Sequence, residues 1–233
     1  MVSYTPTYGL PAPSLGEAPN VPADIAALAD GTESALLALA MLPVDNLLIN
    51  GGFGINQRAA SSYTRTSGQT GYTVDRWILT SGTGATNIVT PTAIATGSFA
   101  GAPRWKLAWN RSVAGSANSY FEQRIEDVRT AAGKNITVSL NAAVASGTAD
   151  ITISVVQNLG TGGSPSSETS PVVSSTITVD TSVSTRRVAT LAVPSISGKT
   201  IGSDENSYLS IRINRASGAG TGTIDLWDAG AVI

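Results

Sequence analysis

From Val44 onward, hydrophobic and polar residues alternate with a period of two. The clearest alternating runs are 136–142, 151–155, 177–179, 209–213 and 224–226. Their intervening positions carry Thr, Ser, Asn, Arg and Asp, so each run would bury one face and expose the other, as strands of antiparallel sandwiches do. Turn-forming residues separate the runs, for example at 81–84, 160–165 and 217–222. The pattern predicts an all-β, antiparallel jelly-roll β-sandwich of roughly nine or ten strands over residues 44–233.

The first 43 residues follow different patterns. Residues 1–22 hold five prolines and two glycines without a regular apolar period, which predicts an extended arm that docks on a neighbouring subunit or is a disordered tail. Residues 23–43 predict a helix that follows Pro22 and stops at Pro43. Its apolar stripe has a spacing of three and four residues, and it could pack on its own domain or associate with copies of itself. We expect oligomerisation through this stripe, which contains Ile25, Leu28, Thr32, Ala35, Leu39 and Leu42.

Composition narrows the range of functions. The chain has no cysteine and no histidine, which excludes thiolate nucleophiles, Ser–His–Asp triads and imidazole metal sites. Only 13% of the residues are charged and the net charge is −2, so there is no basic surplus to bind nucleic acid. We therefore expect a protein without catalytic activity and without a cofactor or metal. Calcium held by loop carboxylates is an alternative for which the sequence selects no ligands.

The N-terminal residues lack a basic stretch followed by an apolar run, and no segment reaches the roughly 18 apolar residues that a membrane span requires. We therefore expect a soluble protein made in a cytoplasm, with no membrane insertion.

The segment 45–79 carries the most informative motif, DNLLINGGFGINQRAASSYTRTSGQTGYTVDRWIL. Gly51 and Gly52 predict a sharp turn with positive φ. Asp75 could pair with Arg76 or with Arg58, just before Trp77, which we expect to anchor the core. These residues fit fold architecture better than a binding site.

Aromatic residues provide candidate sugar-stacking groups. In the tract 103–112, Trp105 and Trp109 face the same way, so they could form either part of the core or a platform for pyranose rings. Tyr120 is a third candidate for carbohydrate binding. Three further tyrosines at predicted strand or loop ends are open to both interpretations: Tyr63, Tyr72 and Tyr208.

Three carboxylates lie close together at Glu122, Glu126 and Asp127. Glycosidases use two placed carboxyl groups, so this cluster could be catalytic. However, Glu122, Arg124 and Glu126 share one strand face, where an arginine can pair with its neighbours. We therefore expect a structural role for this cluster.

Several segments together resemble a known family. NLLINGGF (46–53), INQR (55–58) and DRW (75–77) are similar to the opening of the carbohydrate-binding-module-like (CBM4/9-like) jelly roll that recurs in phage tail-fibre and virion proteins. The similarity continues through 120–128, 133–142, 194–202, 207–213 and 224–233. The N-terminal arm separately resembles the attachment segment of short phage tail proteins.

This resemblance implies a structural protein of the bacteriophage virion, of the tail-fibre or tail-tip type, that helps to recognise host cell-surface glycans. It also implies a homotrimer that contacts other phage virion proteins. A capsid-decoration or head-fibre protein is the alternative, and a free sugar-binding module or hydrolase is a third.

Overall fold

The computed structural model describes residues 3–4, 11–12, 29–30, 32, 46–95, 98, 104–167, 173–183 and 185–233. The chain divides into two compact units, residues 1–45 and residues 46–233. In the first unit, β1 (Ser3–Tyr4) pairs antiparallel with β2 (Pro11–Ala12), and Ala29, Asp30 and Thr32 are helical and exposed. The other residues of the predicted arm and helix, including Ile25, Leu28, Ala35, Leu39 and Leu42, lie outside the described residues. No helix within the described ranges is long and apolar enough to cross a membrane.

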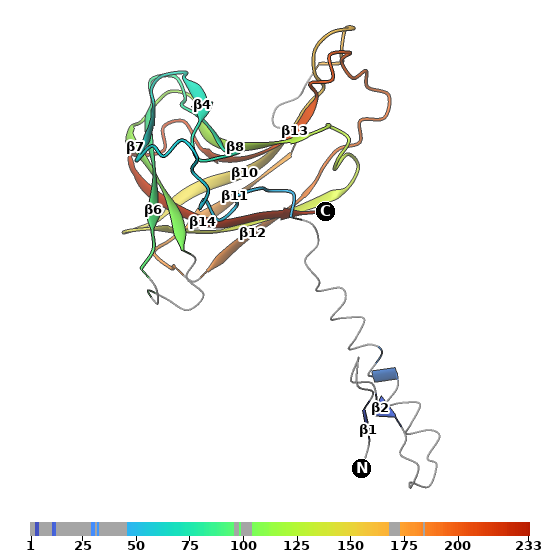
Figure 1. Cartoon of the computed structure of the whole chain (residues 1–233). Helices are drawn as coiled ribbons and strands as arrows, with labels where there is room; N and C mark the ends of the chain where they lie inside the picture. Colours follow the sequence, from blue (N-terminus) through green and yellow to red (C-terminus); the bar gives the residue numbers. More distant parts are fainter. Residues whose placement is uncertain are drawn as a thin grey trace. The chain divides into compact units, whose positions relative to one another are not determined.

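The second unit is an antiparallel jelly-roll sandwich of two six-stranded sheets (Figure 1). The β8 sheet has the order β11-β10-β13-β8-β5-β4, and the β14 sheet has the order β12-β9-β14-β7-β6-β3. The strands are β3 (Tyr63–Arg65), β4 (Thr70–Tyr72), β5 (Ile78–Thr80), β6 (Thr86–Ala93), β7 (Trp105–Val113), β8 (Ser119–Glu126), β9 (Asn135–Val144), β10 (Ala149–Asn158), β11 (Val173–Val179), β12 (Arg186–Ala192), β13 (Tyr208–Arg215) and β14 (Gly222–Val232).

The predicted fold class is therefore confirmed. The five alternating runs of the sequence correspond to β9, β10, β11, β13 and β14. The described part of the second unit has twelve strands instead of nine or ten, because β3, β4 and β5 are only three residues long and show no readable alternation.

An aromatic cluster fills the core between the sheets. Trp77 stacks on Phe121, with ring centroids 5.3 Å apart, and contacts Phe53 at 5.2 Å. Trp109 approaches Phe121 from the opposite sheet at 6.1 Å. All four side chains are fully or almost fully buried, and the prediction that Trp77 anchors the core is confirmed.

The indole N–H groups of Trp77 and Trp109 both have hydrogen-bond acceptors. Trp77 Nε1 donates to the carbonyl of Asn50 at 3.1 Å, and Trp109 Nε1 donates to Asn87 Oδ1 at 3.0 Å. The Asn87 amide in turn donates to the hydroxyls of Ser81 and Ser119. Because a buried N–H without an acceptor is costly, these contacts explain how two tryptophans can lie in the core.

The opening motif turns sharply, but not at the predicted glycines. The positive φ angles are at Asn50 (56°) and Phe53 (54°), so the prediction for Gly51 and Gly52 is wrong. The Asn50 side chain closes the turn by accepting from the Ile55 N–H and donating to the Ile55 and Asp75 carbonyls. An asparagine tolerates this conformation because its side chain can bond the nearby backbone.

Gly51 is required for a different reason, which gives a testable prediction. A Cβ at Gly51 would lie 1.9 Å from the carbonyl oxygen of Ala229 in β14, whereas a Cβ at Gly52 would meet nothing within 4 Å. We expect Gly51→Ala to lower the free energy of unfolding by about 1–3 kcal/mol, because backbone must shift to relieve the clash. Gly52→Ala is the matched control and should be close to neutral in chemical denaturation; equal effects would contradict this explanation.

The predicted Asp75–Arg76 pair does not form. Asp75 instead lies 3.8 Å from Arg58 and accepts a hydrogen bond from the Gln57 N–H. Arg76 has a positive φ of 72° and is exposed, and it forms no ion pair with the described residues. The alternative partner, Arg58, is therefore the correct one.

Candidate functional site

The outer face of the β8 sheet is polar and aromatic. Strand register places the outward side chains in rows that run across the strands. One row joins Tyr72, Ile78, Glu122, Arg212 and Ser154 from five strands. Toward the end of β8, the next two rows contain the pairs Arg124–Ser210 and Glu126–Tyr208. Toward the start of β8, the neighbouring row contains the pair Tyr120–Asn214. This face thus gathers residues from strands that are far apart in the sequence.

A buried carboxylate organises the face. The Glu122 side chain has no exposed surface, yet it points away from the core. Arg212 Nε donates to its Oε2 at 2.7 Å, and the Ser210 hydroxyl donates to the same oxygen at 2.9 Å. Arg124 Nε donates to Oε1 at 3.0 Å, and Arg124 Nη2 lies 2.8 Å from the same oxygen as an ion pair. Charge-assisted hydrogen bonds of this kind fix the positions of both guanidinium groups.

The environment of Glu122 keeps it ionised. Burial by itself raises the pKa of the carboxyl group, but the hydrogen bond and charge of Arg212, the Ser210 bond and the charge of Arg124 together lower the pKa below its ordinary value. Glu122 is therefore a fixed anion under the outer face and does not act as a proton donor near neutral pH.

Each guanidinium group of this network lies over a tyrosine ring. Arg124 is 4.5 Å from the centroid of Tyr208, and Arg212 is 4.3 Å from that of Tyr120. Arg58 lies 5.3 Å from the ring of Tyr72, whose exposed fraction of 52% is large for a tyrosine. Cation–π contacts hold the three rings in place before any ligand arrives.

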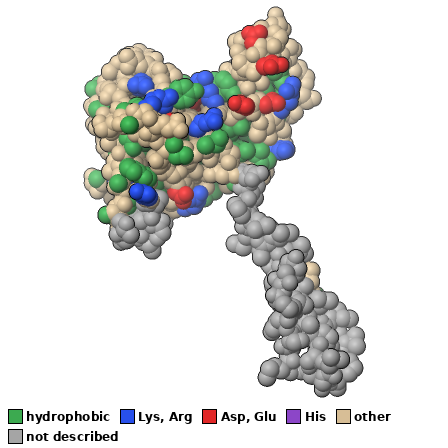
Figure 2. Space-filling view, viewed as in Figure 1, with side chains coloured by type: hydrophobic (Ala, Val, Ile, Leu, Met, Phe, Trp, Pro, Cys, Tyr) green, Lys and Arg blue, Asp and Glu red, His purple; other side chains and the backbone are tan. Residues whose placement is uncertain are grey.

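Loops raise the edges of this face into a cleft. It has a volume of about 690 Å³ and is lined by Tyr72, Arg76, Arg124, Glu126, Asp127, Arg129, Ile201, Gly202, Glu205, Asn206, Ser207 and Tyr208. In Figure 1 the β4 end and the loop before β13 stand on either side of strand β8. Figure 2 shows this side hollowed, with hydrophobic, basic and acidic side chains along it. We call this site the Tyr72–Tyr208 cleft.

Some of the positive-φ residues of the chain lie at the rim of this cleft. Three of the eight described non-glycine residues with positive φ line the cleft: Arg76 (72°), Asp127 (65°) and Glu205 (52°). Such conformations cost about 1–3 kcal/mol each and cluster at ligand sites. The loops thus hold charged side chains at the rim in conformations that an unconstrained chain avoids.

The cleft is suited to binding a neutral polar ligand. Three arginines balance three carboxylates along its wall, so it carries no net charge. It supplies many hydrogen-bond donors and acceptors together with aromatic surface. Within the described ranges, no group of three or more acidic or other metal-ligating side chains could hold a metal ion.

The structure separates the three predicted sugar-binding residues. Trp109 is fully buried with its N–H bonded to Asn87, so it fits the core interpretation and presents no face to a ligand. Trp105 is partly exposed and lines a small pocket at the start of β7, together with Phe53 and Gly54. Tyr120 lies on the outer face of the β8 sheet, so the three residues do not form one platform.

The structure also assigns the three tyrosines that the sequence left open between a core position and a ligand-binding position. Tyr63 is buried and donates to Asn56 Oδ1, whereas Tyr72 and Tyr208 line the cleft. Sequence reasoning did not identify Arg76 or Glu205 as site residues, since both lie on loops. The alternation within 120–126 and 208–214 contained the only local signal for this face, because its polar positions point outward.

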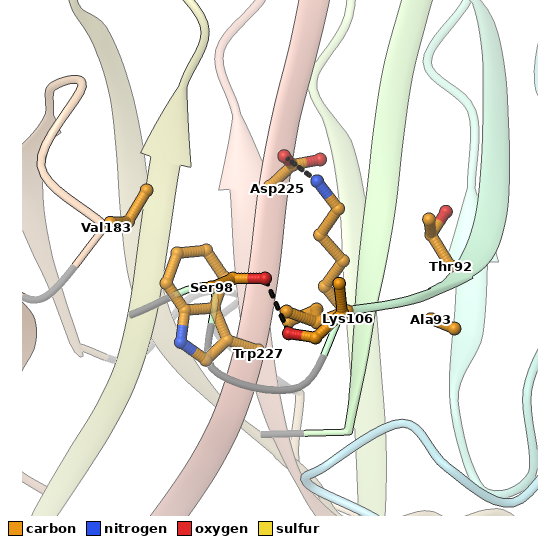
Figure 3. A pocket seen from close by; sticks show the side chains of 9 residues that line it. Thr92, Ala93, Ser98, Lys106, Val183, Asp225 and Trp227 are labelled. Atoms are coloured by element: carbon orange, nitrogen blue, oxygen red, sulfur yellow. Dashed lines mark hydrogen bonds and ion pairs between the residues drawn. The ribbon is translucent and has the colours of Figure 1, made fainter. Parts of the chain in front are cut away.

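A second pocket lies on the outer face of the opposite sheet (Figure 3). It has a volume of about 400 Å³, and Lys106 Nζ lies 2.6 Å from Asp225 Oδ2 across its middle. Trp227 and Val183 form an apolar side of the pocket (Figure 3). Its two opposite charges are paired with one another, which leaves fewer polar groups for a ligand than the Tyr72–Tyr208 cleft offers.

No protein-family model and no curated protein match the chain. Among solved structures, a CBM4 module matches with 15% identity and a TM-score of 0.42, over 79% of this chain and 97% of the module. A cyclase from Fischerella sp. TAU matches with 11% identity and a TM-score of 0.48, over 82% of this chain and 96% of the cyclase chain. The enzymatically active domain of tailspike protein 4 from bacteriophage CBA120 matches with 13% identity and a TM-score of 0.45, over 80% of this chain but only 21% of that domain's chain. Similarities at this level identify no ligand.

Proposed function

We propose that this chain is a non-enzymatic carbohydrate-binding protein of a bacteriophage particle and that the Tyr72–Tyr208 cleft is its binding surface. The observation that carries the proposal is the set of three tyrosines held by arginines on one face, two of them around the buried Glu122. Tyrosine rings suit the apolar C–H faces of sugars, and the surrounding polar groups suit their hydroxyls.

Preorganisation supports this use of the cleft. Ordering a long side chain on binding costs about 0.5–1.5 kcal/mol. Because Arg124 and Arg212 are already fixed by Glu122, the rings of Tyr208 and Tyr120 lose little freedom when a ligand arrives. A weakly binding neutral glycan benefits most from a surface that is already ordered.

Binding without hydrolysis is supported by the state of Glu122, the buried carboxylate under this face. A glycosidase needs one carboxyl group that can donate a proton and a second that acts as base or nucleophile. Glu122 is buried, ionised and fully engaged with two arginines and a serine, so it can serve neither purpose. The chain also lacks the histidine and cysteine that most other hydrolytic sites use.

The assignment to a virion rests on the sequence resemblance of the opening motif and the N-terminal arm to phage tail proteins. Within that setting, a homotrimer would present three clefts to a host surface, and repetition would convert weak single-site binding into high avidity. Antibody labelling of purified particles tests the location, and sedimentation of the full chain tests the trimer. Absence from the particle would refute the virion assignment.

The cleft itself is tested with variants of the full chain. A glycan array first identifies a bound glycan, and calorimetry then measures its affinity. We expect Tyr208→Ala and Tyr72→Ala each to weaken binding about tenfold, which corresponds to the loss of one aromatic contact of about 1.4 kcal/mol. Lys106→Ala, which alters the pocket of Figure 3, should leave the affinity unchanged.

Two outcomes would contradict the proposal. One is that an oligomeric, folded protein binds no glycan on the array or on whole cells. The other is that Lys106→Ala reduces affinity while both tyrosine variants bind normally, which would move the binding site to the β14 sheet.

A further inference from the structure

Two arginines are buried at one end of the sandwich, one from each sheet. Arg111 belongs to β7 and Arg215 to β13, and both point inward, with exposed fractions of 0% and 4%. Neither has an ion pair with any carboxylate of the described residues. By contrast, two other arginines of this sandwich that are not fully exposed have acidic partners: Arg212 pairs with Glu122, and Arg187 pairs with Asp180.

Main-chain carbonyls from the segment 215–222 surround the two guanidinium groups. Arg111 donates to the carbonyls of Ala216, Ala219 and Arg215, at 2.7–3.0 Å. Arg215 donates to the carbonyls of Gly220 and Gly222 and, at 3.3 Å, to that of Trp109. These bonds shape the loop between β13 and β14, but a carbonyl is a dipole and does not neutralise a charge.

The donors outnumber their acceptors. A guanidinium group has five N–H bonds, so the two arginines have ten, and only six of them reach carbonyls. Arg111 Nε is buried without any partner. Burial lowers the pKa of both arginines, and with the added charge of Arg111 the pKa of Arg215 falls to about 10, which still leaves both groups charged at neutral pH.

A pocket of about 340 Å³ opens beside Arg215. It is lined by Val144, Ala145, Ser146, Thr148, Ala149, Arg215, Thr221, Gly222, Thr223 and Ile224. Four of these residues carry hydroxyl groups that can donate hydrogen bonds, and none is acidic. The pocket shares no residue with the Tyr72–Tyr208 cleft.

We propose that this pocket binds a small oxyanion, either a tetrahedral one such as sulfate or a carboxylate. The two uncompensated guanidinium groups supply the charge, the unused N–H groups of Arg215 supply donors, and the surrounding hydroxyls complete the shell. A buried charge without a counterion is strongly unfavourable, so an anion bound here stabilises the folded chain. The ligand contacts Arg215 of β13, the start of β14 and the β9–β10 turn, and so joins the two sheets at this end.

The test measures thermal unfolding of the full chain with sodium sulfate and with sodium acetate in the millimolar range, against sodium chloride at equal ionic strength. A bound anion should raise the Tm along a saturating curve, by about 3–6 °C at ten times its dissociation constant. The general stabilising effect of sulfate instead grows with concentration without saturating. A saturating response to either salt supports the site, and the comparison distinguishes tetrahedral oxyanions from carboxylates.

The most informative variant places a carboxylate side chain at the pocket, so that it takes the position of the free anion. Arg215 is too deeply buried to replace safely, but Thr221 is exposed at the pocket wall. Thr221→Glu should raise the Tm in chloride and abolish the saturating response. Ser174→Glu is the matched control, since it adds the same charge on exposed β11 away from the pocket, and it should respond like the native chain.

Absence of a saturating response to both salts in the native chain would overturn the proposal. An equal response in Thr221→Glu and Ser174→Glu would also overturn it, because the added carboxylate would then not compete for the same site.

Discussion

Replacing Trp77 by alanine is expected to lower the free energy of unfolding by about 3–5 kcal/mol, the range for large aromatic residues removed from a core. Trp77 has no exposed surface, stacks on Phe121 and contacts Phe53. Its removal would leave a cavity between the opening segment and the β8 sheet, and would leave the Asn50 carbonyl without its indole donor. Chemical denaturation of the full chain measures the loss.

Trp105→Ala is the matched control for this prediction. Trp105 is partly exposed at the start of β7, and no aromatic ring contact involves it within the described residues. We expect a clearly smaller loss of stability, because less surface leaves the core and the vacated space opens to water. Equal losses for the two variants would show that the cluster around Trp77 is not the centre of the core.

The second large effect is expected at Glu122. Glu122→Gln removes the anion that holds Arg212 and Arg124 while keeping the size of the side chain. Breaking a buried ion pair on one side typically costs about 3–5 kcal/mol, since an uncompensated charge remains. We expect a value near the lower end, about 3 kcal/mol, because Arg124 is 43% exposed and water screens its share of the interaction.

The pH dependence of stability follows from the same group. The folded state lowers the pKa of Glu122 below its ordinary value of 4.5, so the unfolded chain binds its proton first as the pH falls. The stabilisation is therefore complete above pH 4.5 and is lost as the pH falls through the lower, folded-state pKa. The pKa values of Asp127 and Asp180 are also lowered and add to the same acid sensitivity.

Comparison of two variants isolates the contribution of Glu122. Glu126 lies further along β8 on the same face, is exposed and has no side-chain partner among the described residues. In denaturation curves recorded between neutral and acidic pH, Glu122→Gln should flatten the acid-induced loss of stability, whereas Glu126→Gln should follow the native curve. A native-like acid profile for Glu122→Gln would mean that its carboxylate does not contribute to stability in this way.

Glu122 connects stability with ligand binding, because it holds the arginines that order the outer face. If Glu122→Gln releases Arg124 and Arg212, the rings of Tyr208 and Tyr120 lose the cations that hold them. Stability and glycan affinity would then fall together in this variant. In Tyr208→Ala, affinity should fall with little loss of stability, since Tyr208 is only partly buried.

Local patterns along the chain were sufficient to establish the type of fold and much of the strand content. Period-two alternation identified β9, β10, β11, β13 and β14, because side chains of a strand point alternately to its two faces and one face of each must leave water. The lack of cysteine and histidine restricts the possible chemistry whatever the fold. Trp77 was identifiable as a core residue from its place in the opening motif.

The composition of the cleft depends on tertiary structure, because strand pairing across the chain is not contained in local periodicity. Trp105 and Trp109 share one strand face, yet only Trp109 lies far enough along β7 to be covered by both sheets. Gly51 is constrained by the carbonyl of Ala229, which belongs to the last strand of the chain. Tyr72 reaches the row of Glu122 only because β4, β5, β8 and β13 pair in that order. Which residues form a cleft is thus set by register between distant strands, whereas which residues form strands is set by their immediate neighbours.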